Sequence, residues 1–205
     1  MTELLHTFWQ QLLQTSLLEA VAAICGILSV WFAIKEKIWV YPVGIVSVLL
    51  YVWICYQYKL YADMGVNAYY FLVSVWGWYE WANLPEKPAL VIEKSDKKAI
   101  LFYIIVSVFI AAFLYFILSN FTDSDVPLFD ACTTALFLVA MYLMAIKKIA
   151  HWYWWILGDL LSIPLYLYKG LIFTAFQYVV FTFLAINGLL QWQQKWRISQ
   201  QNKVL

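Results

Sequence analysis

One carboxylic acid lies near the centre of a long apolar stretch, beside aromatic and hydroxyl side chains at helical spacing. A helix over residues 152–168 carries these side chains on one face: Trp152, Trp155, Asp159 and Ser162. A charged side chain inside a membrane-spanning helix costs about 2.5 to 3.5 kcal/mol, so it is expected to face a cavity or a partner. We predict an aromatic wall beside a carboxylate that accepts hydrogen bonds from ligand hydroxyls or faces a cation. The structural alternative is an internal tie between helices.

Two further apolar stretches carry polar and aromatic side chains at helical spacing. The candidate ligand-contacting residues are Asn67, Tyr70, Ser74, Trp78 and Trp81 in residues 66–82, and Gln177 and Phe181 in residues 171–192. Asn67 and Gln177 lie deep in their stretches, where contact with a ligand and contact with a neighbouring helix are both open. Trp81 lies near one end, where aromatic residues gather at membrane surfaces whatever the function.

The composition predicts an all-α integral membrane protein that positions these side chains. The 205 residues are 65% hydrophobic and 12% charged, with a mean hydropathy of +0.76, whereas globular domains carry about 25% charged residues. A chain of this length holds about six to eight spans of roughly 20 residues and no separate nucleotide-binding or catalytic module. The net charge of +1 argues against nucleic-acid binding, which needs a concentrated basic surface.

Seven apolar stretches have the length of a membrane-spanning helix, and charged or turn-forming residues separate them. They cover residues 17–34, 38–56, 66–82, 100–118, 128–146, 152–168 and 171–192. The first, third and fifth loops and the C-terminal tail hold eleven of the 13 lysines and arginines, and the other loops hold Lys59 and Lys169. Because cytoplasmic loops keep positive charge, we predict the N-terminus outside and the C-terminus inside.

An ungapped shift of 111 residues aligns the chain with itself. The informative pairs are Lys37 with Lys148, Gly77 with Gly188 and Trp81 with Trp192. We predict a 3+1+3 parallel repeat, as found in some transporters, although any seven-helix bundle has some self-similarity. The expected parts are an amphipathic helix (1–16), the first repeat (17–82), a cytoplasmic loop with a connecting helix and an outer loop (83–127), the second repeat (128–192) and a cytoplasmic tail (193–205).

Three residues interrupt helical hydrogen bonding or loosen a helix inside the predicted spans. They are Pro42 and Gly44 in the second span and Pro164 in the sixth. A proline frees a backbone carbonyl and bends the helix, so these positions are possible hinges of a moving half. A static kink is equally compatible with the sequence.

Recognisable catalytic and metal-binding motifs are absent from the sequence. It contains no HExxH, GxSxG, CxxC or glycine-rich phosphate loop, and neither His6 nor His151 has ligand-spaced neighbours. We therefore expect neither an enzyme nor a bound metal or cofactor. The last span also lacks the buried lysine that a retinal protein needs, so translocation or sensing of a small molecule remains.

Two segments together resemble the PnuC family of bacterial nicotinamide riboside transporters. They are LYADMGVNAYYFLVSVWGWYEW at residues 60–81 and HWYWWILGDLLSIPLYLYKGLIFTAFQYVVFTFLAINGLLQW at residues 151–192, and the resemblance extends over residues 17–196. It implies a fold similar to SWEET sugar transporters and a homotrimer in the bacterial inner membrane. It also implies entry of the vitamin B3 nucleoside by facilitated diffusion and trapping by a cytoplasmic kinase. The residues implied to lie near the substrate are Trp78, Trp81, Trp155 and Asp159.

The leading hypothesis is a uniporter that stacks the pyridinium ring of nicotinamide riboside on Trp or Tyr. Asp159, Asn67 and Gln177 would then hold the ribose and the carboxamide. Related members carry thiamine or riboflavin, so another vitamin or a sugar is an alternative cargo. The sequence is also compatible with a proton symporter, with Asp159 as proton carrier, and with a membrane receptor that has no transport cycle.

Overall fold

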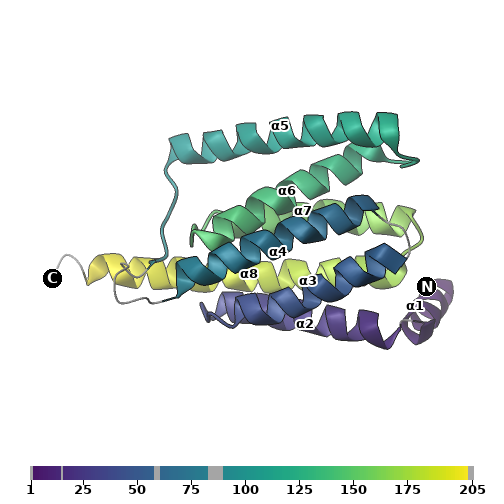
Figure 1. Ribbon diagram of the computed structural model, residues 1–205. Helices are drawn as coiled ribbons and strands as arrows, with labels where there is room; N and C mark the ends of the chain where they lie inside the picture. Colours follow the sequence, from purple (N-terminus) through teal and green to yellow (C-terminus); the bar gives the residue numbers. More distant parts are fainter. Residues whose placement is uncertain (1, 15, 58–60, 83–89, 203–205) are drawn as a thin grey trace.

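The computed structural model describes residues 2–14, 16–57, 61–82 and 90–202. Within these ranges the chain is helical apart from its connecting segments, as the sequence predicts (Figure 1). The helices are α1 (Thr2–Gln14), α2 (Leu17–Ile34), α3 (Val40–Gln57), α4 (Tyr61–Trp81), α5 (Lys97–Phe121), α6 (Pro127–Ala145), α7 (His151–Tyr168) and α8 (Ile172–Gln201). Each predicted apolar stretch overlaps one helix from α2 to α8.

Several of these helices are suited to a hydrocarbon environment. Among the described residues, five helices are long and apolar enough to cross a membrane, namely α2, α3, α5, α6 and α8. The two others that overlap predicted spans, α4 and α7, have 21 and 18 residues but are rich in Tyr and Trp. These two helices carry most of the predicted site residues, and the same polar and aromatic side chains lower their hydropathy.

The helices form two groups that meet side by side. Within the first group α2 packs on α3 and α3 on α4, and within the second group α6 packs on α7 and α7 on α8. Between the groups, α4 contacts α6 and α2 contacts α8, so the first helix of each group touches the last helix of the other. Below, α2–α4 are the first half and α6–α8 the second half.

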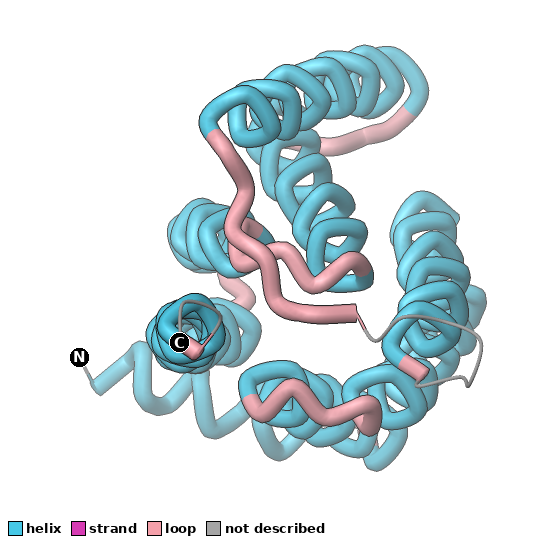
Figure 2. Tube along the Cα trace, turned by 90° about the vertical axis from the view of Figure 1, so that its left-hand side faces the viewer, coloured by secondary structure: helices cyan, strands magenta, loops and turns pink. Residues whose placement is uncertain are grey.

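The connecting helix α5 lies at the outer edge of the bundle (Figures 1 and 2). It packs on α6, and Trp154 Nε1 of α7 donates to its Ser107 Oγ at 2.8 Å. Both of these neighbours belong to the second half. Helix α5 is therefore attached to one half of the bundle and leaves the interface between the halves free.

The two halves end their first helix with the same turn. Glu36 after α2 and Lys147 after α6 have φ of 56° and 52°, and they lie 111 residues apart. The hydrogen bonds that close these Schellman turns are Lys37 N to Phe32 O, Glu36 N to Ala33 O, Lys148 N to Leu143 O and Lys147 N to Met144 O. Glycine is usual at such a position, because a left-handed conformation costs other residues about 1–2 kcal/mol. Here both positions carry charge instead.

Glycines admit an aromatic ring at the same place in each half. A Cβ atom added to Gly77 would lie 2.5 Å from the Tyr41 ring, and one added to Gly188 would lie 2.5 Å from the Trp152 ring. Tyr41 and Trp152 are again 111 residues apart. The aligned glycines are therefore needed because the ring of one helix lies directly on the backbone of another.

The three possible hinges lie in different surroundings. Pro42 is the third residue of α3, where a backbone N–H has no intrahelical partner to lose. A Cβ on Gly44 would lie 2.9 Å from Ser29 Oγ, so this glycine lets α2 and α3 approach closely. Pro164 lies inside α7 and interrupts its hydrogen bonding. The geometry thus favours Pro164 among the three, and hinge motion stays a prediction.

The last helix continues beyond the predicted end of its span. The sequence predicts that the span ends at Trp192, but α8 runs on to Gln201. This polar extension stays helical because its glutamines, lysine and arginine favour helix, and Trp196 packs against the buried core. The start of the predicted tail is therefore helical.

Candidate functional site

The carboxylate of Asp159 is buried in the middle of α7. The residue is 3% exposed, and among the described residues neither a hydrogen bond nor a positive charge compensates it. Ser162, one turn further along the same helix, is 1% exposed, and its hydroxyl also lacks a hydrogen-bond partner within the described part of the chain. Uncompensated polar groups are costly to bury, so this pair marks the place where a ligand or a proton is expected.

Aromatic side chains from both halves lie near Asp159. Tyr70 of α4 and Tyr178 of α8 lie within electrostatic range of its carboxylate. A continuous run of rings follows, with centroid distances of 5.3 Å from Trp155 to Phe137, 6.0 Å from Phe137 to Tyr178 and 5.1 Å from Tyr178 to Tyr166. The last two pairs are stacked, at interplanar angles of 9° and 12°. We call these five rings and Asp159 the aromatic cluster.

Four of the predicted site residues belong to this cluster or border it. Trp155, Asp159 and Tyr70 are members, and Phe181 meets Tyr178 edge to face with centroids 6.2 Å apart. Gln177 is on the same helix as Tyr178, and its side chain lies close to the Tyr51 hydroxyl of α3. It therefore lies at the contact between the two halves.

The remaining predicted residues lie elsewhere or have protein partners. Asn67 Nδ2 donates to Asp63 O of its own helix at 2.9 Å. Trp78 is 43% exposed, and Ser74 is buried. Trp81 Nε1 donates to Ala145 O at 3.0 Å, which ties α4 to α6. The structure thus brings Trp155, Asp159 and Phe181 together with Tyr70, whereas Trp81 joins α4 to the end of α6.

Three members of the cluster did not emerge as candidates from the sequence. The sequence has 41 aromatic residues in all, so residue type alone does not distinguish Phe137, Tyr166 and Tyr178 from the others. The signal in the sequence that relates to Phe137 is Gly158, because a Cβ atom at that position would collide with the Phe137 ring. Glycine directly before Asp159 thus lets Phe137 of α6 approach the site.

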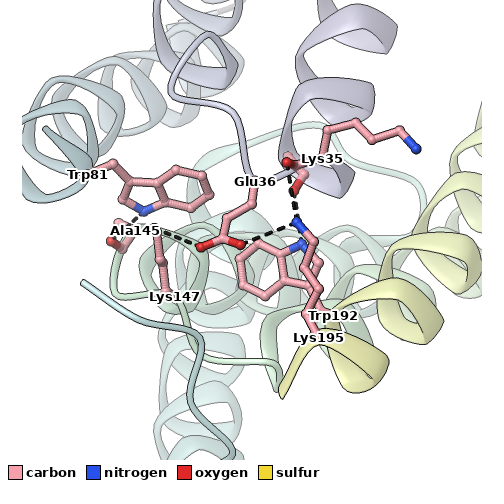
Figure 3. Close-up of polar contacts among 8 residues, drawn as sticks. Lys35, Glu36, Trp81, Ala145, Lys147, Trp192 and Lys195 are labelled. Atoms are coloured by element: carbon pink, nitrogen blue, oxygen red, sulfur yellow. Dashed lines mark hydrogen bonds and ion pairs between the residues drawn. The ribbon is translucent and has the colours of Figure 1, made fainter. Parts of the chain in front are cut away.

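The two halves are tied together at the end of the bundle that carries Lys35, Lys147, Lys148 and Lys195. We call it the lysine-rich end. Trp192 Nε1 donates to Ala33 O at 3.0 Å, so the aligned residues Trp81 and Trp192 each donate to the last turn of the other half's first helix. Ion pairs join Glu36 to Lys147 at 3.0 Å and to Lys195 at 3.3 Å (Figure 3).

A small cavity also lies at the lysine-rich end, away from the aromatic cluster. Its volume is about 190 Å³, and its lining includes Lys94, Tyr153 and Arg197. The cavity opens between the start of α7 and the end of α8. Asp159 does not line this cavity and is 3% exposed, so the protein is closed around the carboxylate in this conformation.

Comparison with known proteins decides the family. Residues 16–194 match the sequence profile of the family described as Nicotinamide mononucleotide transporter. The chain belongs to this family. Its members are transporters and not enzymes, and with several apolar helices the chain is a multi-pass protein of the bacterial inner membrane.

Individual relatives of this transporter are similar over most of their length. The nicotinamide riboside transporter PnuC of Escherichia coli K12 is 27% identical over 203 residues, which cover 86% of this chain and 85% of PnuC. The riboflavin/roseoflavin transporter RibM of Streptomyces davaonensis is 25% identical over 193 residues, covering 91% of this chain and 85% of RibM. A crystal structure of the vitamin B3 transporter PnuC aligns with a TM-score of 0.71 and 27% identity, covering 93% of this chain and 88% of that chain. The resemblance to PnuC transporters is thereby confirmed.

Proposed function

We propose that this transporter carries nicotinamide riboside into the cell. The observation that carries the proposal is the buried, uncompensated carboxylate of Asp159 among aromatic rings. Nicotinamide riboside has a fixed positive charge on its pyridinium ring. A carboxylate compensates that charge, and aromatic faces attract a cation by about 0.5 to 2 kcal/mol each. Nicotinamide riboside, which the PnuC relatives are named for transporting, fits this chemistry.

In the proposed complex the pyridinium ring stacks within the aromatic cluster, near Trp155 and Tyr178. The ribose hydroxyls and the carboxamide then pair with Asp159, Gln177 and Asn67, which spares these groups an unpaired position in hydrocarbon. Asn67 already gives one N–H to Asp63 O, so its carbonyl and second N–H remain for the ligand. The Ser162 hydroxyl, which has no hydrogen-bond partner within the described ranges, is one helical turn from Asp159 and available to the ligand.

The proposed topology is the 3+1+3 parallel repeat, similar to SWEET transporters. The contacts of α4 with α6 and of α2 with α8, and the aligned turns at Glu36 and Lys147, support it. The distribution of lysine and arginine supports an N-terminus outside and a C-terminus inside, with the lysine-rich end facing the cytoplasm. The connecting helix α5 exposes Phe102, Phe109 and Phe116, which lipid or the neighbouring subunits of the proposed homotrimer would cover.

The proposed mechanism is facilitated diffusion by alternating access, followed by phosphorylation of the nucleoside in the cytoplasm. Purified protein in liposomes should equilibrate labelled nicotinamide riboside and never accumulate it above the outside concentration. Accumulation driven by an ion gradient would show that the protein is a symporter and not a uniporter. Asp159 could then carry the proton. Protein that binds the ligand without equilibrating it across the bilayer would be a receptor.

Riboflavin is the second candidate, because RibM is similar over 91% of this chain. A flavin ring also stacks on aromatic side chains, but it is neutral and needs no counter-charge. Calorimetry of the purified protein with nicotinamide riboside, thiamine and riboflavin separates these cargoes. Tighter binding of riboflavin than of nicotinamide riboside would reject our first choice.

A further inference from the structure

Two residues in the same unfavourable backbone conformation, one in each half, form an ion pair with each other. Glu36 and Lys147 occupy aligned positions of the two Schellman turns, where glycine is the residue of lowest strain. Their charges are opposite, and Lys147 Nζ lies 3.0 Å from Glu36 Oε1. A strained position that is filled by a pair of complementary charges points to a functional role.

This ion pair lies among the contacts that join the halves at the lysine-rich end (Figure 3). Lys195 Nζ of α8 meets the other oxygen of Glu36 at 3.3 Å. The Lys147 ammonium also lies 4.6 Å from the centroid of the Trp81 ring, and the Trp81 side chain is bonded to Ala145 O. The side chains of Lys147 and Glu36 are 11% and 24% exposed, so solvent screens their attraction only in part.

The position of the pair determines what its rupture does. Glu36 belongs to the first half, and both of its partners belong to the second half. The halves cannot separate at the lysine-rich end while these contacts and the two Trp-to-carbonyl bonds persist. In the present conformation these contacts are formed and Asp159 is 3% exposed.

We propose that Glu36 and Lys147 form the cytoplasmic gate of the transporter. Their ion pair holds the lysine-rich end closed while the ligand is loaded from the opposite side, and its rupture opens the path from Asp159 to the cytoplasm. The assignment of this end to the cytoplasm rests on the proposed function and topology. The neighbouring ion pair between Lys148 and Glu93 joins the second half to the segment before α5, so it does not bridge the halves.

A purely structural role makes a different prediction for glycine. If the two residues only closed their turns, Glu36→Gly and Lys147→Gly would relieve backbone strain and leave the conformational equilibrium unchanged. A gate role requires that either substitution opens the lysine-rich end even though the fold is kept. Thermal unfolding measures the first effect, and accessibility of the site measures the second.

The test uses a cysteine at the closed site. Cys25, Cys55 and Cys132 are replaced by alanine, and Ser162→Cys is labelled with a membrane-impermeant thiol reagent added to the lysine-rich side of sealed vesicles. We expect Glu36→Gly and Lys147→Gly each to raise the labelling rate at least tenfold, with an unfolding temperature equal to that of the parent or higher. Glu93→Gln, the matched control, should leave the labelling rate within twofold.

The exchange of charges tests whether the pair itself is responsible. In a Lys195→Gln background, which removes the second cation near position 36, Glu36→Lys combined with Lys147→Glu should return labelling to within threefold of the parent. Each charge change alone should label fast. Unchanged labelling in the glycine variants, or fast labelling that the exchange does not reverse, would overturn the gate.

A second readout uses the cargo. Cysteines at positions 36 and 147 in the same cysteine-free chain, joined by a bifunctional methanethiosulfonate reagent, should slow uptake of nicotinamide riboside at least tenfold until a reductant is added. Uptake at the rate of the unlinked protein would also overturn the gate. Labelling needs no ligand. If the variants label as expected but the protein binds no nicotinamide riboside, the proposed cargo is rejected and the gate is retained.

Discussion

The two halves of the bundle have the same framework but not the same interior. Both end their first helix with a charged left-handed residue, place an aromatic ring on a glycine and donate a tryptophan N–H to the other half. At the depth of Asp159 they differ. The residues of the second half are Phe137, Trp155, Asp159 and Tyr178, and the aligned residues of the first half are Gly26, Gly44, Val48 and Asn67.

The helical framework is therefore duplicated in the two halves, but the interior around Asp159 is not. Small residues in the first half let its own helices approach, as Gly44 does beside Ser29. Large rings and the carboxylate lie in the second half, so the interior of the bundle is asymmetric. We therefore expect paired substitutions in the framework to act alike, and paired substitutions in the interior to act differently.

The largest effect is expected from the aligned glycines. Gly77→Ala and Gly188→Ala each place a Cβ 2.5 Å from a buried ring, and overpacking of this kind costs about 1–3 kcal/mol. Thermal unfolding in detergent should show a similar loss for both variants. Gly65→Ala is the control, because nothing lies within 4 Å of the added atom. A loss in one half alone would contradict the duplicated framework.

Asp159 tests the asymmetry of the interior. Asp159→Ala should weaken nicotinamide riboside binding at least tenfold, about 1.4 kcal/mol or more, and Asp159→Asn should do the same because it removes the charge at constant size. The aligned change Val48→Ala should leave the affinity within threefold. Calorimetry measures both, with assembly checked by size-exclusion chromatography. Unchanged affinity in both Asp159 variants would assign the residue a structural role.

The two tryptophan bonds test the framework again, with a smaller effect. Trp81→Phe and Trp192→Phe each remove one buried hydrogen bond and leave a carbonyl oxygen unpaired, at a cost of about 1 kcal/mol or somewhat more. The unfolding temperature should fall by a similar amount in both. Trp53→Phe, at an exposed position, is the control. Affinity for the nucleoside should change little, because neither ring belongs to the aromatic cluster.

The smallest effect is expected at Asn67, the residue aligned with Tyr178. Its proposed contacts with the ligand are neutral hydrogen bonds at a partly exposed position, so Asn67→Ala should weaken nucleoside binding by less than about threefold, under 0.7 kcal/mol. Tyr178→Ala should weaken binding more, since Tyr178 stacks on two rings of the cluster. Equal losses in the two variants would show that the interior is more symmetric than proposed.

Much of the helical framework follows from local pattern. The predicted limits of residues 17–34 coincide with α2, because a run of apolar residues between charged breaks is a local property. The other limits lie within three residues of the helix ends, except at the start of α4 and the end of α8, where polar residues continue the helix. The stripe of Trp155, Asp159 and Ser162 was also readable, since helical spacing places those residues on one face. The spacing does not predict that Trp81 bonds to Ala145, because that contact depends on which helix is the neighbour.

The amino-acid sequence alone determined that this chain is a helical membrane protein of the PnuC type with a charged residue deep in one helix, because hydropathy, spacing and motif are properties of neighbouring residues. The tertiary structure alone decided which rings surround Asp159 and that Glu36 faces Lys147. Glu36 and Lys147 are more than a hundred positions apart in the sequence. Only the packing of one half against the other brings such residues together.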